Sequence, residues 1–402
     1  MTTVRQNTAW LYIGNKNWTL GDTEKLVEWC ARHRVGKLLL HLHDWTNPAA
    51  EFAEQMDSVV EACSKAGIEI HGMIGTLQLR AEDRASLPFQ SREAYCVDYE
   101  GISNWDEPLA GRRYVLDPSN PDVVSFIAGR CKDMLVKHPG LAGIHLDFIR
   151  FYHYESRLSI DTNQAGHWTV IPRAGEPLKL TTANGTTTTF FVEQALNHYN
   201  DPPIGRHLHL RRSYHYCFCE RCLERLAREF NLSIPDELEE TRQRADWILK
   251  HHAEDWYAFR SSLITGVVRN IRREITAQRK EAQLSAAIWY NSPYGNELRN
   301  EPFHPGSEYE QFGQKWWEWI KEGLMDFVCP MNYWLTPESF GQIIREQIAR
   351  SENKVPLYAG LLRSDEFPID QPLWEKYKLV AQEAGAAGIS FFSYGGWKDL
   401  DS

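Results

Sequence analysis

The chain has 402 residues, of which 43% are hydrophobic and 24% are charged, and its formal net charge is -10. These proportions are close to the averages of globular proteins, and they exclude a disordered or fibrous chain. The negative charge offers no basic surface to phosphate backbones or anionic lipids. We therefore expect neither a nucleic-acid partner nor a membrane partner.

No stretch of the sequence reaches the roughly 20 apolar residues that a membrane span needs, and the first residues lack the apolar core of a signal peptide. We therefore expect a cytoplasmic protein, or a secreted or periplasmic one whose signal has been removed. Most of the eight cysteines are isolated, unlike those of a disulfide scaffold. The sequence leaves the oligomeric state open.

Short apolar runs alternate with longer segments of helical period along nearly the whole chain. Repeated βα units give this pattern, and no glycine-rich phosphate loop follows the first run, so the sequence predicts an α/β fold, a single (β/α)8 TIM barrel, rather than an open doubly wound sheet. The eight predicted strands are residues 10–13, 37–43, 68–73, 141–147, 284–290, 325–331, 355–361 and 388–393. The predicted helices are residues 22–33, 50–66, 121–137, 245–280, 308–322, 337–350 and 372–384, and the final helix is missing or short.

Two long loops leave the carboxyl ends of predicted strands, where barrel enzymes place their active sites. The third loop covers residues 74–119. The fourth covers residues 148–244, which we interpret as a subdomain inserted into a barrel domain of residues 1–402. In the fourth loop, Asn184-Gly185 lies between two β-branched runs and predicts a β-hairpin, either over the site or with no role in binding.

The fourth predicted strand ends in Asp147. Residues two apart in a strand share a face, so His145 and Asp147 both point into the barrel. Arg150 follows closely and favours the ionised carboxylate. Asp147 is therefore a candidate nucleophile or proton-transfer group; the alternative is an ion pair that fixes the fourth loop.

One reaction that such a carboxylate could carry out is glycoside hydrolysis, which ordinarily needs a second carboxyl group. Glu297, after the turn that follows the fifth predicted strand, is our first candidate. Asp44, Glu155 and Asp365 also lie in loops after strand ends and are alternatives.

Polar and aromatic residues collect at the predicted strand ends, where they suit the binding of a hydroxylated ligand, although such aromatics also commonly plug a barrel. His41 and His43 share the inward face and either bind sugar hydroxyls or, together with His71 or His145 and Asp147, ligate a metal ion. The predicted substrate-binding set is His41, His43, Asp44, Trp45, His71, His145, Arg150, Trp289, Asn291, Asn332, Tyr333, Trp334 and Tyr394.

Cys217, Cys219 and Cys222 have the spacing of tetrahedral metal sites but supply only three thiolates. Cys96 and His215 are the candidates for the fourth ligand. A zinc ion held there would be structural and would fix the long loops; the alternative is a set of free thiols.

Three segments, Gly143–Arg150, residues 315–327 and Cys329–Trp334, together resemble glycosyl-hydrolase-like family 10 barrels. The resemblance runs in order along the barrel and implies a carbohydrate-active enzyme. Its fourth-strand acidic residue matches Asp147, and its sixth-strand motif matches Pro330, Tyr333 and Trp334. Residues 291–295 match the family only loosely, which leaves Glu297 without support from the resemblance.

The cysteine trio also resembles the zinc-binding trio of family 42 β-galactosidases. Those enzymes use one further upstream cysteine, which implies Cys96 here.

Our hypothesis from the sequence is a glycoside hydrolase that cleaves an oligosaccharide or polysaccharide with Asp147 and Glu297. Catalysis would need no cofactor, and zinc would be structural. The alternatives are a metal-dependent amidohydrolase that uses His41, His43 and Asp147, and a carbohydrate-binding barrel without catalysis.

Overall fold

The computed structural model describes residues 7–13, 18–41, 50–106, 113–151, 155–160, 168–170, 177–181, 187–191, 208–213, 216–289 and 312–400. The chain divides into two compact units. Unit 1 comprises Met1–Gln90, Pro118–Arg150 and Arg260–Ser402, and unit 2 comprises Ser91–Asp117 and Phe151–Phe259. Unit 2 therefore contains most of the predicted insertion together with part of the third loop.

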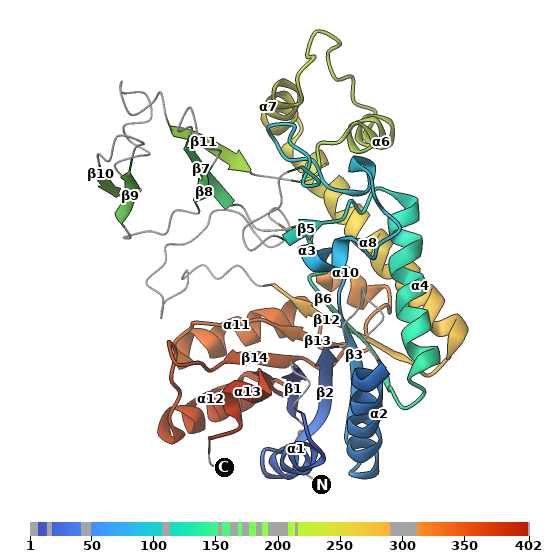
Figure 1. Cartoon of the computed structure of the whole chain (residues 1–402), viewed down its shortest axis with the longest axis vertical. Helices are drawn as coiled ribbons and strands as arrows, with labels where there is room; N and C mark the ends of the chain where they lie inside the picture. The colour runs from blue at the N-terminus through green and yellow to red at the C-terminus, as the bar shows by residue number, and fades with distance from the viewer. Residues whose placement is uncertain are drawn as a thin grey trace. The chain divides into compact units, whose positions relative to one another are not determined.

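Unit 1 contains an eight-stranded sheet whose neighbouring strands are all parallel (Figure 1). The strands, in the order in which they follow one another around the sheet, are β1 (Asn7–Leu11), β2 (Val35–His41), β3 (Glu69–Gly75), β6 (Gly143–Asp147), β12 (Gln283–Ile288), β13 (Phe327–Pro330), β14 (Tyr358–Leu362) and β15 (Gly388–Phe392). A parallel bridge between Val328 and Leu357 links β13 to the start of β14 and closes the ring. The predicted (β/α)8 barrel is confirmed.

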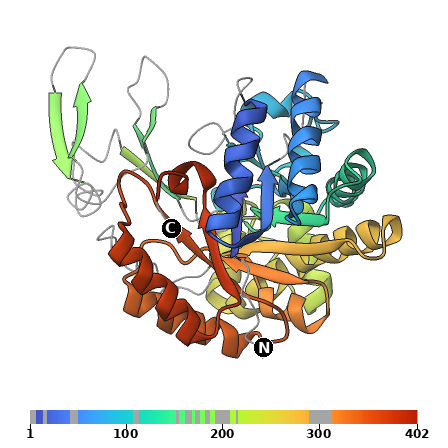
Figure 2. The ribbon, with the colours of Figure 1, turned by 90° about the horizontal axis from the view of Figure 1, so that it is seen from below.

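Helices lie around the strands of unit 1, as Figure 2 shows. They are α1 (Leu20–Arg32), α2 (Ala50–Lys65), α4 (Pro121–Lys137), α8 (Ala253–Gln278, which begins in unit 2), α10 (Trp316–Lys321), α11 (Pro337–Arg350), α12 (Gln371–Ala384) and the short α13 (Tyr394–Trp397). The strand β4 (Gln78–Arg80) and the short helix α3 (Ala81–Arg84) follow β3. The predicted helix 245–280 is two helices, because the chain leaves helical geometry at His252.

Side-chain caps fix where several barrel helices begin. Thr19 and Asp22 form a capping box at α1. The Asp22 backbone N–H donates to Thr19 Oγ1 at 3.2 Å, and the Thr19 backbone N–H donates to Asp22 Oδ2 at 2.9 Å. Asn120 caps α4 and Asp370 caps α12 by accepting a backbone N–H. In both helices a proline follows in the first turn, where its missing N–H costs nothing.

The interior of the barrel is filled by apolar side chains from strands all around the ring. The buried cluster consists of Trp10, Leu39, Met73, Ala287, Phe327, Cys329 and Tyr358. These residues leave the barrel a packed core and not a pore. A ligand site in unit 1 must therefore lie above them, at the carboxyl ends of the strands.

Polar groups meet near the amino ends of the strands. Lys37 on β2 forms an ion pair with Glu69 on β3, and Gln283 contacts both at 3.3–3.4 Å. His71 Nε2 lies 3.6 Å from Glu69 Oε2. His71 and Lys37 lower the pKa of Glu69 to about 2. Because 3.6 Å is long for a hydrogen bond, we assign the larger effect to Lys37.

Unit 2 contains smaller elements. They are the 3-10 helix η1 (Arg92–Ala94), β5 (Arg113–Val115), β7 (Glu155–Ile160), β8 (Trp168–Val170), β9 (Pro177–Thr181), β10 (Thr187–Phe191), β11 (Leu208–Ser213), α6 (Glu220–Phe230) and α7 (Thr241–His251). Strands β9 and β10 are antiparallel and pair Thr181 with Thr187, which confirms the predicted hairpin, although Asn184 and Gly185 lie outside the described residues. Phe218 stacks on Trp256 with 4.2 Å between ring centroids.

The ion pair at the base of the barrel should make stability depend on pH. The Glu69 pKa is lower in the folded than in the unfolded chain, so its stabilising contribution is complete above about pH 4.5 and is lost as the pH falls towards 2. Glu69→Gln should remove this part of the pH dependence. Since the Glu69 side chain is 42% exposed, solvent screening limits the loss at pH 7 to roughly 1 kcal/mol. Urea unfolding of both proteins at pH 7, 4 and 3 measures it; an unchanged pH dependence in the variant would contradict the assignment.

Candidate functional site

Asp147 lies at the carboxyl end of β6 and is partly exposed. Its main chain is fixed by the sheet, where it pairs with Gly75 of β3 and its carbonyl accepts the Thr76 N–H at 2.8 Å. The Phe148 N–H donates to Asp147 Oδ1 at 2.8 Å. Asp147 is thus presented at the barrel mouth with its carboxylate oriented by the backbone.

Arg150 is buried and held between two aromatic rings. Its guanidinium carbon lies 4.7 Å from the ring centre of Phe148 and 5.2 Å from that of Trp289, distances at which cation–π attraction is significant. The buried Gln314 fixes this arrangement, because its side-chain oxygen accepts a hydrogen bond from the Trp289 backbone N–H at 2.7 Å and its side-chain nitrogen donates to the Ile149 carbonyl at 3.0 Å. The sequence analysis missed Gln314, because it lies outside the predicted strands and belongs to no recognised motif.

Aromatic side chains form a continuous wall beside Asp147. Phe392, at the end of β15, lies 5.3 Å from the Tyr333 ring and 6.2 Å from the Tyr12 ring. Tyr333 also packs against Trp334 at 5.7 Å, and Tyr12 packs against His41 at 5.3 Å. Tyr12 is 38% exposed and offers a flat face to a ligand. Sequence reasoning missed Tyr12, although it lies two residues beyond Trp10 and shares its inward parity.

Burial raises the pKa of Tyr333 well above its usual range, and the negative charge of Asp147 adds to the effect. Tyr333 therefore keeps its proton at any working pH. It can donate a hydrogen bond near Asp147, but it cannot act as a base.

Two bulky residues at the mouth have left-handed backbone conformations. Phe148 follows β6 with φ of 48°, and Trp334 lies shortly after β13 with φ of 58°. Such conformations are uncommon for large side chains and cluster at functional sites. They redirect the chain directly after Asp147 and Tyr333.

The predicted histidines of β3 and β6 lie deeper than a substrate contact requires. His145 points inward as predicted but is fully buried; its Nδ1 is 2.8 Å from Ser285 Oγ and its ring packs against Trp10. His71 is fully buried against Phe327. Both residues belong to buried layers of side chains below Asp147, and their predicted binding role stays a prediction.

Two other predicted contact residues pack against helices. Asn332 is buried and forms reciprocal amide hydrogen bonds of 2.8 and 2.9 Å with Gln347 of α11, which direct its side chain towards the helix layer. Tyr394 packs on Trp29 of α1 at 5.2 Å. Each residue follows a strand end, where the chain has already turned towards the helices.

Several predicted residues lie outside the described part of the chain, namely His43, Asp44, Trp45, His215, Asn291 and Glu297. Glu155 begins β7 in unit 2, and Asp365 is exposed in the loop after β14. The partner carboxylate of Asp147 therefore remains a prediction.

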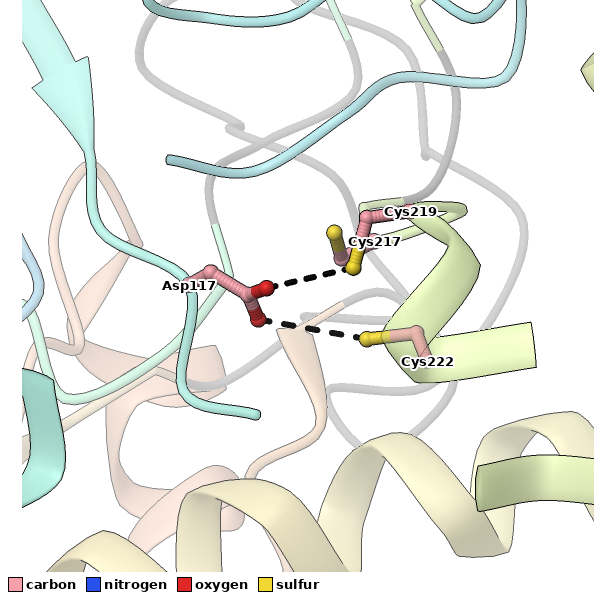
Figure 3. Close-up of side chains that lie close together, drawn as sticks. All are labelled: Asp117, Cys217, Cys219 and Cys222. Carbon is pink, nitrogen blue, oxygen red and sulfur yellow. Dashed lines mark hydrogen bonds between the residues drawn. The ribbon is translucent and has the colours of Figure 1, made fainter. Parts of the chain in front are cut away.

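A second site lies in unit 2. The ligand atoms of Asp117, Cys217, Cys219 and Cys222 all lie within 4.8 Å of one another, and Figure 3 shows the sulfur atoms of Cys219 and Cys222 facing the carboxylate, with the Cys217 sulfur next to that of Cys219. Cys219 Sγ donates to Asp117 Oδ2 at 3.2 Å, and Cys222 Sγ donates to Oδ1 at 3.9 Å. The predicted cysteine trio is thus brought together, and Asp117, which no sequence motif marks, faces it.

The thiols of this site differ in acidity. Burial alone would raise the pKa of Cys217, but hydrogen bonds from Cys219, Cys222 and Cys96 outweigh it and lower the pKa. Burial raises the pKa of Cys222 and Cys96.

Among the described residues, this cluster is the group with a donor set that suits a metal ion. His41 and Asp147 do not form such a group there. The described part of the chain also has no helix long and apolar enough to cross a membrane.

Comparison with known proteins gives likeness in structure only. No family model matches the chain, and no curated protein matches it. The catalytic domain of β-amylase from Paenibacillus polymyxa superimposes with a TM-score of 0.52 at 10% identity over 99% of this chain and 95% of that one. The β-galactosidase of Bacillus circulans sp. alkalophilus gives 0.54 at 13% identity, and that of Halorubrum lacusprofundi gives 0.54 at 12%.

Each β-galactosidase comparison covers 96% of this chain but only about half of the other, 50% and 52% respectively. At these identities the likeness establishes the fold alone. The chain therefore has the (β/α)8 barrel fold that these glycoside hydrolases share, and its resemblance to family 10 stays a prediction.

The buried amide pair predicts that Asn332 stabilises the fold and does not bind ligand. Asn332→Ala should lower the free energy of unfolding by about 1–3 kcal/mol, because the Gln347 amide is left buried without its partner. Replacing both residues with leucine should cost less than the sum of the two single replacements. Urea unfolding of the single and double variants tests this; additive losses would show that the pair does not act as a unit.

Proposed function

We propose that the protein is a glycoside hydrolase that cleaves an oligosaccharide or polysaccharide at the barrel mouth. The observation that carries this proposal is Asp147, a carboxylate oriented by the backbone at the end of β6, whose charge acts on Tyr333 in the aromatic wall of Tyr12, Phe392 and Tyr333. The fold shared with a β-amylase and with β-galactosidases supports the same chemistry.

Asp147 suits a role as nucleophile or as proton-transfer carboxylate. Its Oδ1 accepts the Phe148 N–H, and a hydrogen bond of this kind orients a carboxylate for attack or proton transfer. An oxocarbenium-like transition state would be stabilised by the negative charge of Asp147. Tyr333, which stays protonated, contributes its ring to the aromatic wall.

The reaction needs a second carboxylate, for which Glu297 remains our proposal. The partner must lie about 5 Å from Asp147 for retention of anomeric configuration, or about 6.5 to 9.5 Å away for inversion.

The amidohydrolase alternative would require His41, His43 and Asp147 to hold a metal ion. His41 packs on Tyr12, an arrangement that favours an aromatic binding surface over a metal ligand. The carbohydrate-binding alternative shares the mouth but requires no chemistry at Asp147, and turnover separates the two.

Asp147→Asn should lower kcat for glycan hydrolysis by at least about 10³-fold, because the amide can neither attack nor transfer a proton. The matched control is Asp133→Asn, the same chemical change at an exposed position of α4, which should keep full activity. Hydrolysis is measured by reducing-end release on a panel of oligosaccharides and polysaccharides, with circular dichroism to verify folding. Full turnover by a folded Asp147→Asn variant would remove Asp147 from the mechanism.

Tyr12→Ala should raise KM roughly tenfold while changing kcat little, because it removes an exposed aromatic face at a distance from the bond that breaks. The control is Tyr12→Phe, which keeps the ring and should keep the KM. A fall in kcat with unchanged KM would place Tyr12 in the chemistry and not in substrate binding.

A further inference from the structure

We propose that Asp117, Cys217, Cys219 and Cys222 hold one Zn²⁺ ion within unit 2, and that Cys96 lies outside its coordination shell. The chemistry at the barrel mouth does not enter this proposal. The site differs from the one that the family 42 resemblance implies, in which an upstream cysteine is the fourth ligand.

The geometry of the four side chains fits a tetrahedral ion. Zinc–sulfur bonds of about 2.3 Å place the ligand atoms of a tetrahedral site roughly 3.5–4 Å apart. The four donors already lie within 4.8 Å of one another, and the two carboxylate oxygens of Asp117 each face a thiol (Figure 3). Small side-chain rotations therefore suffice to close the shell.

Local sequence explains why the sulfurs converge. Cys219 is the N-cap of α6 and Cys222 lies in its first turn, so the two thiols project from one helix end. Cys217 precedes them in irregular chain, and the Val97 backbone N–H donates to its sulfur at 3.2 Å. Backbone N–H groups commonly stabilise metal-bound thiolates in this way.

Charge also favours a divalent ion. The Asp117 side chain is only 1% exposed, and a buried carboxylate facing three thiols needs compensation. Arg221 Nη1 supplies part of it, donating to Asp117 Oδ2 at 3.2 Å and to the Glu93 carbonyl at 3.1 Å. With three thiolates and a carboxylate as ligands, the two charges of zinc and the one of Arg221 leave a net charge of about -1. Thiolate-rich sets of this kind select zinc among the abundant divalent cations.

Cys96 has other partners. Its thiol donates to the Leu116 carbonyl at 3.4 Å, and it lies outside the group whose ligand atoms are all within 4.8 Å. Cys96 is therefore not positioned to be a ligand.

The site would be structural, because four protein ligands leave no open position. Asp117 and Cys219 are 102 residues apart in the chain, so the ion would join the segment 91–117 to helix α6. Closing a loop of this length with a strong bond restricts the unfolded chain and stabilises unit 2.

The decisive experiment uses the 402-residue chain loaded with Zn²⁺ alone. Elemental analysis measures the number of zinc ions per chain, and zinc X-ray absorption spectroscopy then identifies the atoms bound to zinc and their distances. We expect one zinc per chain, with three sulfur neighbours at about 2.3 Å and one oxygen at about 2.0 Å. Four sulfur neighbours would overturn the role of Asp117 and favour Cys96. Absence of bound zinc after reconstitution would overturn the site itself.

Variants provide an independent test. Asp117→Ala and Cys219→Ser should each weaken zinc binding at least tenfold in a competition titration with a chelating dye. Cys96→Ser should keep one zinc with an unchanged absorption spectrum, like the control Cys131→Ser, a buried thiol of α4 in unit 1. Retention of zinc by Asp117→Ala together with its loss in Cys96→Ser would contradict the proposal. Hydrogen exchange of α6, slow with zinc and faster after chelation, reports the structural effect without any activity assay.

Discussion

The packed interior of the closed barrel is the constraint on which the rest of unit 1 depends. Eight parallel strands direct alternate side chains inward, and Trp10, Phe327 and Tyr358 are among those that fill the space below the mouth. Burial of so much aromatic surface is a large part of the stabilisation of the fold. It also determines where function is possible, because Asp147, the last inward residue of β6, is partly exposed while His145 below it is fully buried.

Electrostatics at the mouth follows from this packing. Burial lowers the pKa of both His71 and His145, so neither adds positive charge beneath the site. Burial keeps Tyr333 protonated. Among the described residues, Asp147 and Arg150 carry charge at the mouth, and the guanidinium is held by the rings of Phe148 and Trp289. An oriented carboxylate together with aromatic side chains suits a neutral, hydroxylated ligand.

Unit 2 is organised differently. The described part of this unit has short strands, with β9 and β10 forming a two-stranded hairpin and β7, β8 and β11 a three-stranded sheet. Small sheets of this size are marginally stable alone. Phe218, which stacks on Trp256, and the three clustered cysteines belong to the segment that leads into α6 and to its first turn, and a bound ion there would supply cohesion that a small core cannot.

The amino-acid sequence alone determined the eight strands, the barrel class, the inward parity of Asp147 and His145, and the clustering of three cysteines, because each depends on local periodicity or spacing. Only the tertiary structure decided how deep each inward residue lies, since parity identifies a face but not a layer. It also decided that Asn332 pairs with Gln347 and that Tyr394 packs on Trp29. The sequence could not identify Asp117 as a neighbour of the cysteines, because these residues lie about a hundred residues away in the chain. Only folding brings their atoms together.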